Sequence, residues 1–241
     1  MKLAIIGAGR IGLAIYKLLK SVDYAPYDNF NIKICDTRVA AETHGATLPV
    51  IDFIDASDLK MLSSYLDNSD VVISATNYNF NRDIVQLAIK KGKHYVDLTE
   101  DVATTNWIRE YTKDASVSVI PQCGLAPGAI NIIGAHLARQ FEKPVSLKLR
   151  VGALPLYSAN RMSYYLSWNT AGLLNEYVNM CDTIVNRGKA KVKPLEGLEK
   201  IIIDGIEYEA FNTSGGVGTV SYTHLRAHET LRYLVCRLLL E

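Results

Sequence analysis

Short apolar runs alternate with amphipathic runs over the first half of the 241-residue chain. The apolar runs have the length and composition of strands, and the runs between them carry apolar residues at helical spacing. The strands that we predict cover residues 2–6, 31–35, 47–51, 71–75, 94–98 and 117–120. This alternation is typical of a parallel sheet with helices on both faces, so we predict a doubly wound α/β domain over residues 1–124.

Two of the predicted helices have recognisable ends. Ser57 is placed to cap a helix that carries Leu59 and Leu66. Asn81 is placed to open a second helix, which Gly92 would end.

The pattern changes after the last of these strands. A predicted helix at about 128–141 is followed by residues 145–151, in which apolar and polar side chains alternate. A period of two is typical of a strand with one face in water. We therefore place a domain boundary near residues 122–128 and predict a smaller α+β domain over residues 125–219.

Residues 220–241 differ from the rest of the chain in composition. They contain six Leu and three Arg but no Lys, Gly, Pro, Asp or Asn. They resemble the translated adaptor sequence that contaminates the ends of gene fragments, so we expect a non-native tail and leave it out of functional reasoning. His224 and His228 lie within it without a third ligand, and we predict no metal site.

Composition narrows the class of partner. The chain has 26 basic and 25 acidic residues and a net charge of +1, which gives no electrostatic surface for nucleic acid or an anionic membrane. A small-molecule partner is favoured. The four cysteines are far apart and no signal peptide or long apolar span is present, which predicts a cytoplasmic protein with reduced thiols.

The first predicted strand leads into Gly7-x-Gly9-x-x-Gly12 and an amphipathic run. Gly7 allows a tight turn, Gly9 lets the backbone approach a pyrophosphate, and Gly12 lets the helix pack closely. The first helical amides, from Arg10 and Ile11 onward, would face the phosphates. A plain strand-to-helix turn is the alternative, but the context favours a dinucleotide site.

Asp36 ends the second predicted strand, 24 residues beyond Gly12, where an acid that binds the ribose belongs. A carboxylate there accepts hydrogen bonds from both ribose hydroxyls and repels a 2′-phosphate, so we predict NAD rather than NADP. Thr37 and Arg38 complete this segment. Arg38 is open to three interpretations: a partner for a 2′-phosphate, a flank of the adenine, or a solvated surface charge.

Polar segments follow the later strands, at the sheet edge where ligands bind in such folds. Ala75, Thr76 and Asn77 are suited to the cofactor ribose and nicotinamide, with a hydrogen-bonded turn and helix cap as the alternative. Glu100 and Asp101 are the predicted catalytic carboxylates, and a capping box is the alternative there.

Cys123 and Gly124 follow the sixth predicted strand, within PQCGLAPG. We assign both to the substrate-binding segment. Cys123 has no His nearby in sequence to activate it, which favours a small buried filler over a nucleophile.

Six segments in order resemble the saccharopine dehydrogenase family, which includes saccharopine reductases and lysine 6-dehydrogenases. They are GAGRIG, HYVDLTEDV, PQCGLAPGAIN, RVGALP, LSWNTAGLLNEY and YEAFNTSGG, and the resemblance covers roughly residues 2–219. It implies a Rossmann domain, an α+β domain, and an amino-acid-like substrate oxidised at a C–N bond. Members of the family continue well beyond the SGG segment, so we expect the second domain to be incomplete and the complete protein to be a homodimer.

The resemblance also directs attention to Asn160, Tyr164, Trp168 and Asn169 as substrate-binding residues. An aromatic-rich run with interspersed Ser and Asn suits a pocket that needs a flat wall and a few hydrogen bonds, although core packing is the alternative. Arg150 is a candidate for the substrate carboxylate, and a surface charge is its alternative.

These assignments predict an oxidoreductase. NAD would accept a hydride from the carbon that bears the amine, giving an imine that water hydrolyses. The alternative is a non-catalytic dinucleotide-binding regulator or sensor, because binding of a dinucleotide does not imply turnover.

Overall fold

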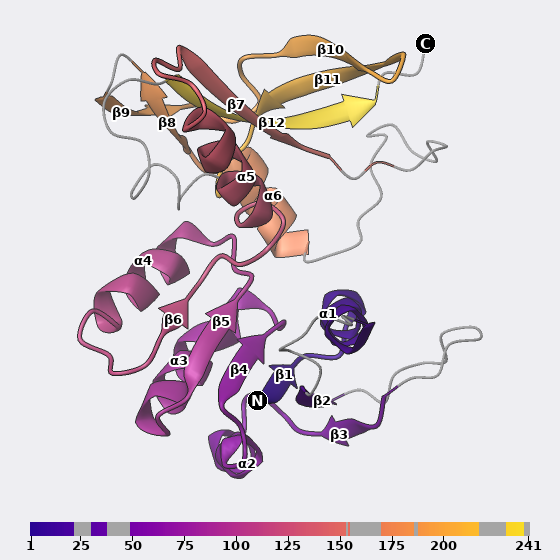
Figure 1. Ribbon diagram of the computed structural model, residues 1–241, viewed down its shortest axis with the longest axis vertical. Helices are drawn as coiled ribbons and strands as arrows, with labels where there is room; N and C mark the ends of the chain where they lie inside the picture. The colour runs from indigo at the N-terminus through magenta and orange to yellow at the C-terminus, as the bar shows by residue number, and fades with distance from the viewer. Residues whose placement is uncertain are drawn as a thin grey trace. The chain divides into compact units, whose positions relative to one another are not determined.

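The computed structural model describes seven stretches of the chain and divides them between two compact units (Figure 1). Unit 1 comprises Met1–Thr99 and Ala103–Cys123, and unit 2 comprises Glu100–Val102 and Gly124–Glu241. The described residues are 1–21, 30–37, 49–152, 154, 170–185, 188–216 and, as backbone only, 230–238.

Unit 1 is built on a six-stranded sheet in the order β3-β2-β1-β4-β5-β6. All five strand pairings are parallel. The strands are β1 (Lys2–Ile6), β2 (Asn31–Asp36), β3 (Ile51–Phe53), β4 (Val71–Ser74), β5 (His94–Asp97) and β6 (Val119–Ile120). The predicted doubly wound α/β fold is confirmed, and the third strand begins at the last residue of the range predicted for it.

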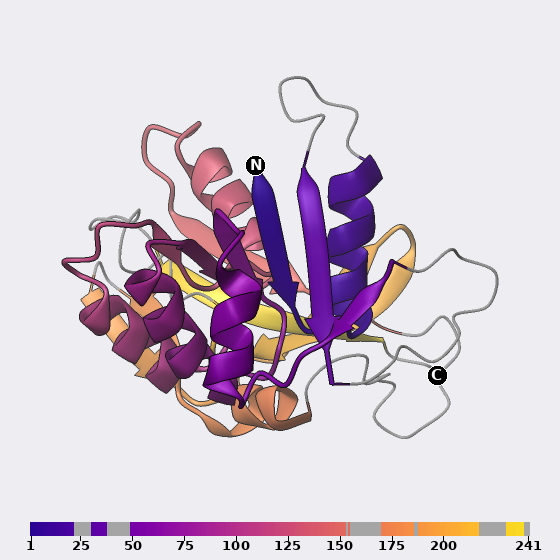
Figure 2. The same ribbon diagram turned by 90° about the horizontal axis from the view of Figure 1, so that it is seen from below.

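Helices cover both faces of this sheet, because successive strand residues point to opposite faces. Leu3 and Ile5 of β1 belong to a core cluster that packs against α1, whereas Ala4 and Ile6 belong to the cluster that receives α2, α3 and α4. Figure 2 shows α1 beside β1 and β2. The helices are α1 (Arg10–Ser21), α2 (Leu59–Leu66), α3 (Asn81–Lys90) and α4 (Val102–Tyr111), with a short 3-10 helix η1 (Tyr78–Phe80) before α3.

The cap predicted for α2 is wrong by one residue. The Asp58 carboxylate accepts from the backbone N–H groups of Lys60 and Met61, both at 3.0 Å. Ser57 instead donates its hydroxyl to Asp55 at 2.7 Å. Ser and Asp are both good caps, and the adjacent carboxylate, which the helix dipole also favours, occupies this position.

Helix α3 begins and ends where the sequence predicts, but the Asn81 side chain has a different role from the one expected. The helix begins at Asn81, but the Asn81 side chain accepts from Ser74 Oγ at 2.7 Å and does not cap the helix. Gly92 follows the last turn with φ of +66° and donates its N–H to Ile89 O at 2.9 Å. A positive φ at the end of a helix favours glycine.

Unit 2 contains a mixed sheet in the order β10-β11-β12-β8-β9, and β7 pairs with β12. The β7–β12 pairing is parallel and the others are antiparallel. The elements are α5 (Ala129–Ala138), β7 (Ser146–Val151), α6 (Thr170–Val178), β8 (Cys181–Val185), β9 (Gly188–Val192), β10 (Glu199–Ile203), β11 (Ile206–Asn212) and β12 (Thr230–Leu238).

The core of unit 2 is small. Leu149 of β7 and Ile184 of β8 are its buried centre, with Ile130 of α5 packed against them. Gly134 lies directly over Leu149, since a Cβ at Gly134 would overlap the leucine side chain. The predicted alternation along 145–151 agrees with β7, in which Leu149 is buried and Lys148 exposed.

The backbone of residues 230–238, within the predicted tail, forms β12 between β11 and β8. Residues 217–229 and 239–241 lie outside the described residues. Among the helices with described structure, none has the length and apolar character that a membrane span requires.

Candidate functional site

The strand order of unit 1 reverses direction at β1, and ligands bind at the carboxyl edge of the sheet beside such a reversal. The chain leaves β1 toward β2 on one side, and β4 takes the place on the other side of β1. Such a reversal opens a crevice beyond the carboxyl ends of the two central strands. The segments that follow β1, β2 and β4 therefore form the candidate dinucleotide site.

The glycine turn after β1 has two positions that tolerate no side chain. Gly7 has φ of +100°, donates its N–H to Cys35 O at 2.8 Å, and leaves only 2.7 Å between an added Cβ and Ala75 O. A Cβ at Gly12 would overlap Gly7 O. Helix α1 thus starts directly against the turn, as the motif predicts.

Gly9 differs from both neighbours. A Cβ placed on Gly9 would have no heavy atom within 4 Å, so the backbone there faces open space. The first N–H groups of a helix have no carbonyl within the helix to bond, and the helix dipole adds partial positive charge. Open backbone beside these amides is the surface that a pyrophosphate requires.

Asp36 fastens the end of β2 to this turn. Its Oδ2 accepts from the N–H of Ala8 at 2.8 Å, and Thr37 Oγ1 lies 3.4 Å from Oδ1 as a weak donor. The carboxylate therefore lies against the glycine turn, at the position predicted for the ribose acid. Arg38 lies outside the described residues.

The segment after β4 lies against the same turn. Ala75 N donates to Ile6 O at 2.8 Å, which extends the β1–β4 ladder beyond the strands. The hydroxyls of Thr76 and Ser74 lie 3.0 Å apart. Asn77 caps η1, since its side-chain oxygen accepts from Asn79 N at 3.1 Å. Asn77 thus has the helix-capping role that was the alternative to a cofactor contact. Ala75 and Thr76 lie beside the glycine turn.

A buried carboxylate organises the segments after β5 and β6. Asp97 is 0% exposed and accepts from Tyr95 OH, Thr99 N and Gln122 N, each at 3.0 Å. Burial raises the pKa of Asp97 above its usual value, and the three hydrogen bonds oppose that shift. Arg109 Nη2 donates to Gln122 Oε1 at 3.1 Å. These contacts hold Gln122 in a left-handed conformation, with φ of 64°.

Glu100 and Asp101, the predicted catalytic carboxylates, begin the segment that leads into α4 and are both partly buried. Glu100 lies against the residues after β11. A Cβ on Gly215, which has φ of +84°, would lie 2.9 Å from Glu100 O. Within unit 2 the structure therefore brings Glu100 together with Gly215, far apart in the sequence.

Glu176 belongs to the same cluster and was missed by the sequence analysis. It lies on α6, is 8% exposed, and its backbone carbonyl accepts from Ser214 N at 2.9 Å. Burial, and then the negative charge of Glu100, raise the pKa of Glu176 to about 8. A signal was present, because Glu176 follows the buried Gly172 and Leu173 by four and three residues and so shares their helix face.

The proposed filler role of Cys123 is wrong, since its side chain is exposed. Its Sγ donates weakly to Ile120 O at 3.5 Å. Surrounding protein atoms partly remove water from the thiol and the Asp97 charge acts in the same direction, so the pKa of Cys123 is raised. The thiolate is disfavoured, which agrees with the argument against a nucleophile. Gly124 donates its N–H to Pro127 O at 2.9 Å within a tight turn.

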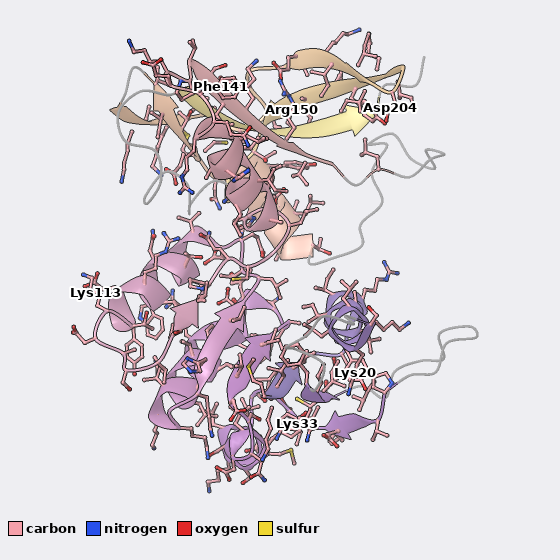
Figure 3. All side chains as sticks on the ribbon, viewed as in Figure 1. Lys20, Lys33, Lys113, Phe141, Arg150 and Asp204 are labelled. Atoms are coloured by element: carbon pink, nitrogen blue, oxygen red, sulfur yellow. The ribbon has the colours of Figure 1, made fainter. Side chains whose placement is uncertain are left out.

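Arg150, labelled in Figure 3, already has a carboxylate partner. Its Nε donates to Glu199 Oε1 at 2.9 Å, and Lys148 Nζ reaches the other oxygen at 2.5 Å. The side chain is 30% exposed. The ion pair with Glu199 neutralises the charge of Arg150 in the absence of a substrate carboxylate. Asn160, Tyr164, Trp168 and Asn169 lie outside the described residues, and no cluster of three or more possible metal ligands occurs in the described part of the chain.

Comparison with known proteins finds a family model that matches most of unit 1 and solved structures that are similar in fold over most of the chain. The family model described as the saccharopine dehydrogenase NADP binding domain matches residues 3–120. The apo saccharopine dehydrogenase (L-Glu forming) from Saccharomyces cerevisiae is similar in structure, with a TM-score of 0.73, 20% identity, and coverage of 98% of this chain and 55% of the yeast chain.

A second similar structure is the homospermidine synthase from Legionella pneumophila, solved in complex with NAD. Its TM-score is 0.63 at 13% identity, with coverage of 97% of this chain and 65% of that chain. At these identities the likeness shows a shared fold. This chain spans about half of the yeast protein's length and about two thirds of the Legionella protein's.

Proposed function

We propose that the chain belongs to the saccharopine dehydrogenase family, whose NADP binding domain resembles residues 3–120, and that it is a dinucleotide-dependent oxidoreductase acting on the C–N bond of an amino-acid substrate. The observation that carries this proposal is the glycine turn between β1 and α1, with open backbone at Gly9 and the Asp36 carboxylate hydrogen-bonded to Ala8 N beside it. These features fit a dinucleotide as they stand. The C–N chemistry is inferred from the family.

NAD is the cofactor that we propose. Gly9 and the first turn of α1, up to Gly12, would hold the pyrophosphate, and Asp36 would accept from the ribose hydroxyls. A 2′-phosphate would bring negative charge to the Asp36 carboxylate. The description of the matching family names NADP, so the preference has to be measured.

Replacing Asp36 with alanine is expected to weaken NAD binding by about 1–3 kcal/mol, the scale of hydrogen bonds to a charged group. The variant loses the ribose contacts and also the hydrogen bond from Ala8 N at 2.8 Å. Titration of the protein with NAD and NADP by calorimetry measures both affinities. Asp83→Ala, an exposed carboxylate on α3, serves as the control. Tighter binding of NADP than of NAD by the unaltered protein would contradict the assignment.

The bound nicotinamide supplies the hydride acceptor for the carbon that bears the amine. Residues of this chain would transfer protons to and from the substrate nitrogen and would orient the substrate. Glu100 is the base that we propose for the amine proton, with Asp101 as the neighbouring alternative. Asn160, Tyr164, Trp168 and Asn169 remain proposed substrate contacts.

The proposed function is tested by following NADH formation at 340 nm with NAD and a set of amines. The set comprises lysine, saccharopine and polyamines, with alanine as a control amino acid. Amine-dependent reduction supports the oxidoreductase. Tight binding of NADH without reduction by any amine, also in a chain carrying the family's C-terminal part, would indicate a regulator instead.

Deleting residues 220–241 is expected to leave NADH affinity unchanged, because every residue of the proposed dinucleotide site lies in unit 1. Fluorescence titration with NADH compares the shortened and full chains. A loss of affinity beyond about threefold, or ~0.7 kcal/mol, would show that the tail supports the nucleotide-binding unit. That result would contradict its assignment as non-native.

A further inference from the structure

Two successive amides of the glycine turn are hydrogen-bonded to the end of β2. Gly7 N donates to Cys35 O at 2.8 Å, and Ala8 N donates to Asp36 Oδ2, also at 2.8 Å. The first bond continues the β1–β2 pairing, in which Ile6 lies opposite Cys35, and any residue can supply its carbonyl. The second bond requires an acceptor on the side chain of residue 36. The conformation of the turn at Ala8 therefore depends on Asp36.

The amide of Ala8 lies in a buried part of the turn. Ala8 is 8% exposed, and its side chain belongs to the core cluster that contains Leu3 and Ile5. A buried N–H group that loses its acceptor costs free energy, because water cannot replace the lost partner. A carboxylate is also a stronger acceptor than a neutral group. We therefore expect the turn at Ala8 to rearrange when the Asp36 side chain is removed.

Other contacts already fix the two ends of the turn. A Cβ on Gly7 would lie 2.7 Å from Ala75 O, and a Cβ on Gly12 would overlap Gly7 O. These positions are packed against the segment after β4 and against α1. Gly9, by contrast, faces open space. Because Gly9 directly follows Ala8, the hydrogen bond to Asp36 controls the backbone that we propose as the pyrophosphate surface.

We infer that Asp36 is a positioning residue for this turn as well as a proposed partner of the ribose. Its carboxylate holds Ala8 N, and thereby the Gly9 backbone, in the conformation that receives the pyrophosphate. This inference rests on the proposed dinucleotide site. The positioning role requires only an acceptor at residue 36, so it affects a diphosphate ligand that has no ribose hydroxyls.

Electrostatics alone predicts the opposite effect. A carboxylate near a pyrophosphate repels it, so removal of the Asp36 charge by itself would strengthen diphosphate binding. Loss of the hydrogen bond to Ala8 N would weaken binding. Asp36→Ala and Asp36→Asn both remove the charge, but the amide oxygen of asparagine can still accept from Ala8 N. A comparison of these two variants therefore isolates the hydrogen bond.

The first arm of the test measures binding of 2′,3′-dideoxy-ADP and ADP to the full chain by calorimetry. The dideoxy compound lacks both ribose hydroxyls. Asp36→Ala is expected to bind it about tenfold more weakly than Asp36→Asn does, the scale of one lost buried hydrogen bond. Asp52→Ala removes an exposed carboxylate from β3, the strand beside β2, and is expected to bind dideoxy-ADP at least as tightly as the unaltered protein.

The second arm follows amide hydrogen exchange by NMR without any ligand. The Ala8 amide is expected to be protected in the unaltered protein and in Asp36→Asn, and to exchange about tenfold faster in Asp36→Ala. The amide of Ile5 in β1 reports the fold, and its exchange should be the same in all three proteins. Equal affinities of the two Asp36 variants for dideoxy-ADP, or an Ala8 amide equally protected in Asp36→Ala, would each overturn the inference.

Failure of the proposed function has different signs. If the unaltered protein binds neither ADP nor NADH, the dinucleotide site fails and the inference fails with it. If the protein binds both but no amine reduces NAD, the proposed oxidoreductase activity fails. The positioning role of Asp36 is then still decided by dideoxy-ADP binding and by the exchange of the Ala8 amide.

Discussion

Replacing Gly9 with valine is expected to abolish dinucleotide binding while unit 1 remains folded. The Cβ of the added side chain would have no heavy atom within 4 Å, so we expect the fold to accommodate it. The space around that Cβ is the proposed path of the pyrophosphate, which the side chain would block. We expect NADH affinity to fall by more than about 100-fold, or ~3 kcal/mol. Fluorescence titration measures the affinity, and circular dichroism with thermal unfolding measures the fold.

Gly12→Ala is the matched control, since it adds a smaller side chain one helical turn away. Its Cβ would overlap Gly7 O, so we expect the fold to be destabilised by about 1–3 kcal/mol or more, as overpacking costs. We thus expect Gly9→Val to reduce NADH binding without unfolding the protein, and Gly12→Ala to reduce stability. An unchanged NADH affinity in folded Gly9→Val would remove the dinucleotide from this turn.

Replacing Glu176 with glutamine is expected to stabilise the protein increasingly as the pH rises from 5 to 8. The pKa of Glu176 is about 8 in the folded chain against an ordinary value of 4.5, so the folded state binds more protons than the unfolded state between these values. Stability from this group is therefore present at low pH and is lost as the pH rises through the window. Glutamine does not titrate and removes that loss.

The expected difference between Glu176→Gln and the unaltered protein grows by about 2–4 kcal/mol from pH 5 to pH 8, since raising a pKa by one pH unit corresponds to ~1.4 kcal/mol. Urea unfolding at each pH provides the free energies. Glu142→Gln is exposed and should show no such trend. A difference independent of pH would mean that Glu176 is ionised in the folded state.

The sheet of unit 1 could be predicted from the sequence because each of its strands is marked by residues that are close together in the chain. The apolar runs in β1, β4 and β5 are short, and a helix begins within a few residues of the end of each. The glycine motif likewise places three backbone requirements within six residues. Two of these, the close contacts of Gly7 and Gly12, are met in the structure.

Local choices between equivalent residues were harder to predict. Ser57 and Asp58 are both good caps, and only the path of the chain decides which one meets the helix amides. Cys123 has a small apolar side chain that is often buried, yet the turn after β6 leaves it exposed. Arg150 was a candidate for a substrate carboxylate, and only the approach of β10 supplied Glu199 as its partner.

The sequence by itself determined the fold of unit 1 and its glycine turn, since strand periodicity and glycine spacing are set by neighbours in the chain. Only the tertiary structure decided the environment of the carboxylates. Asp97, one of three neighbouring acids, accepts three hydrogen bonds, whereas the charge of Glu100 acts on Glu176, which lies much later in the chain. Burial and charge repulsion act through space, so the protonation of these groups depends on contacts that no local pattern contains.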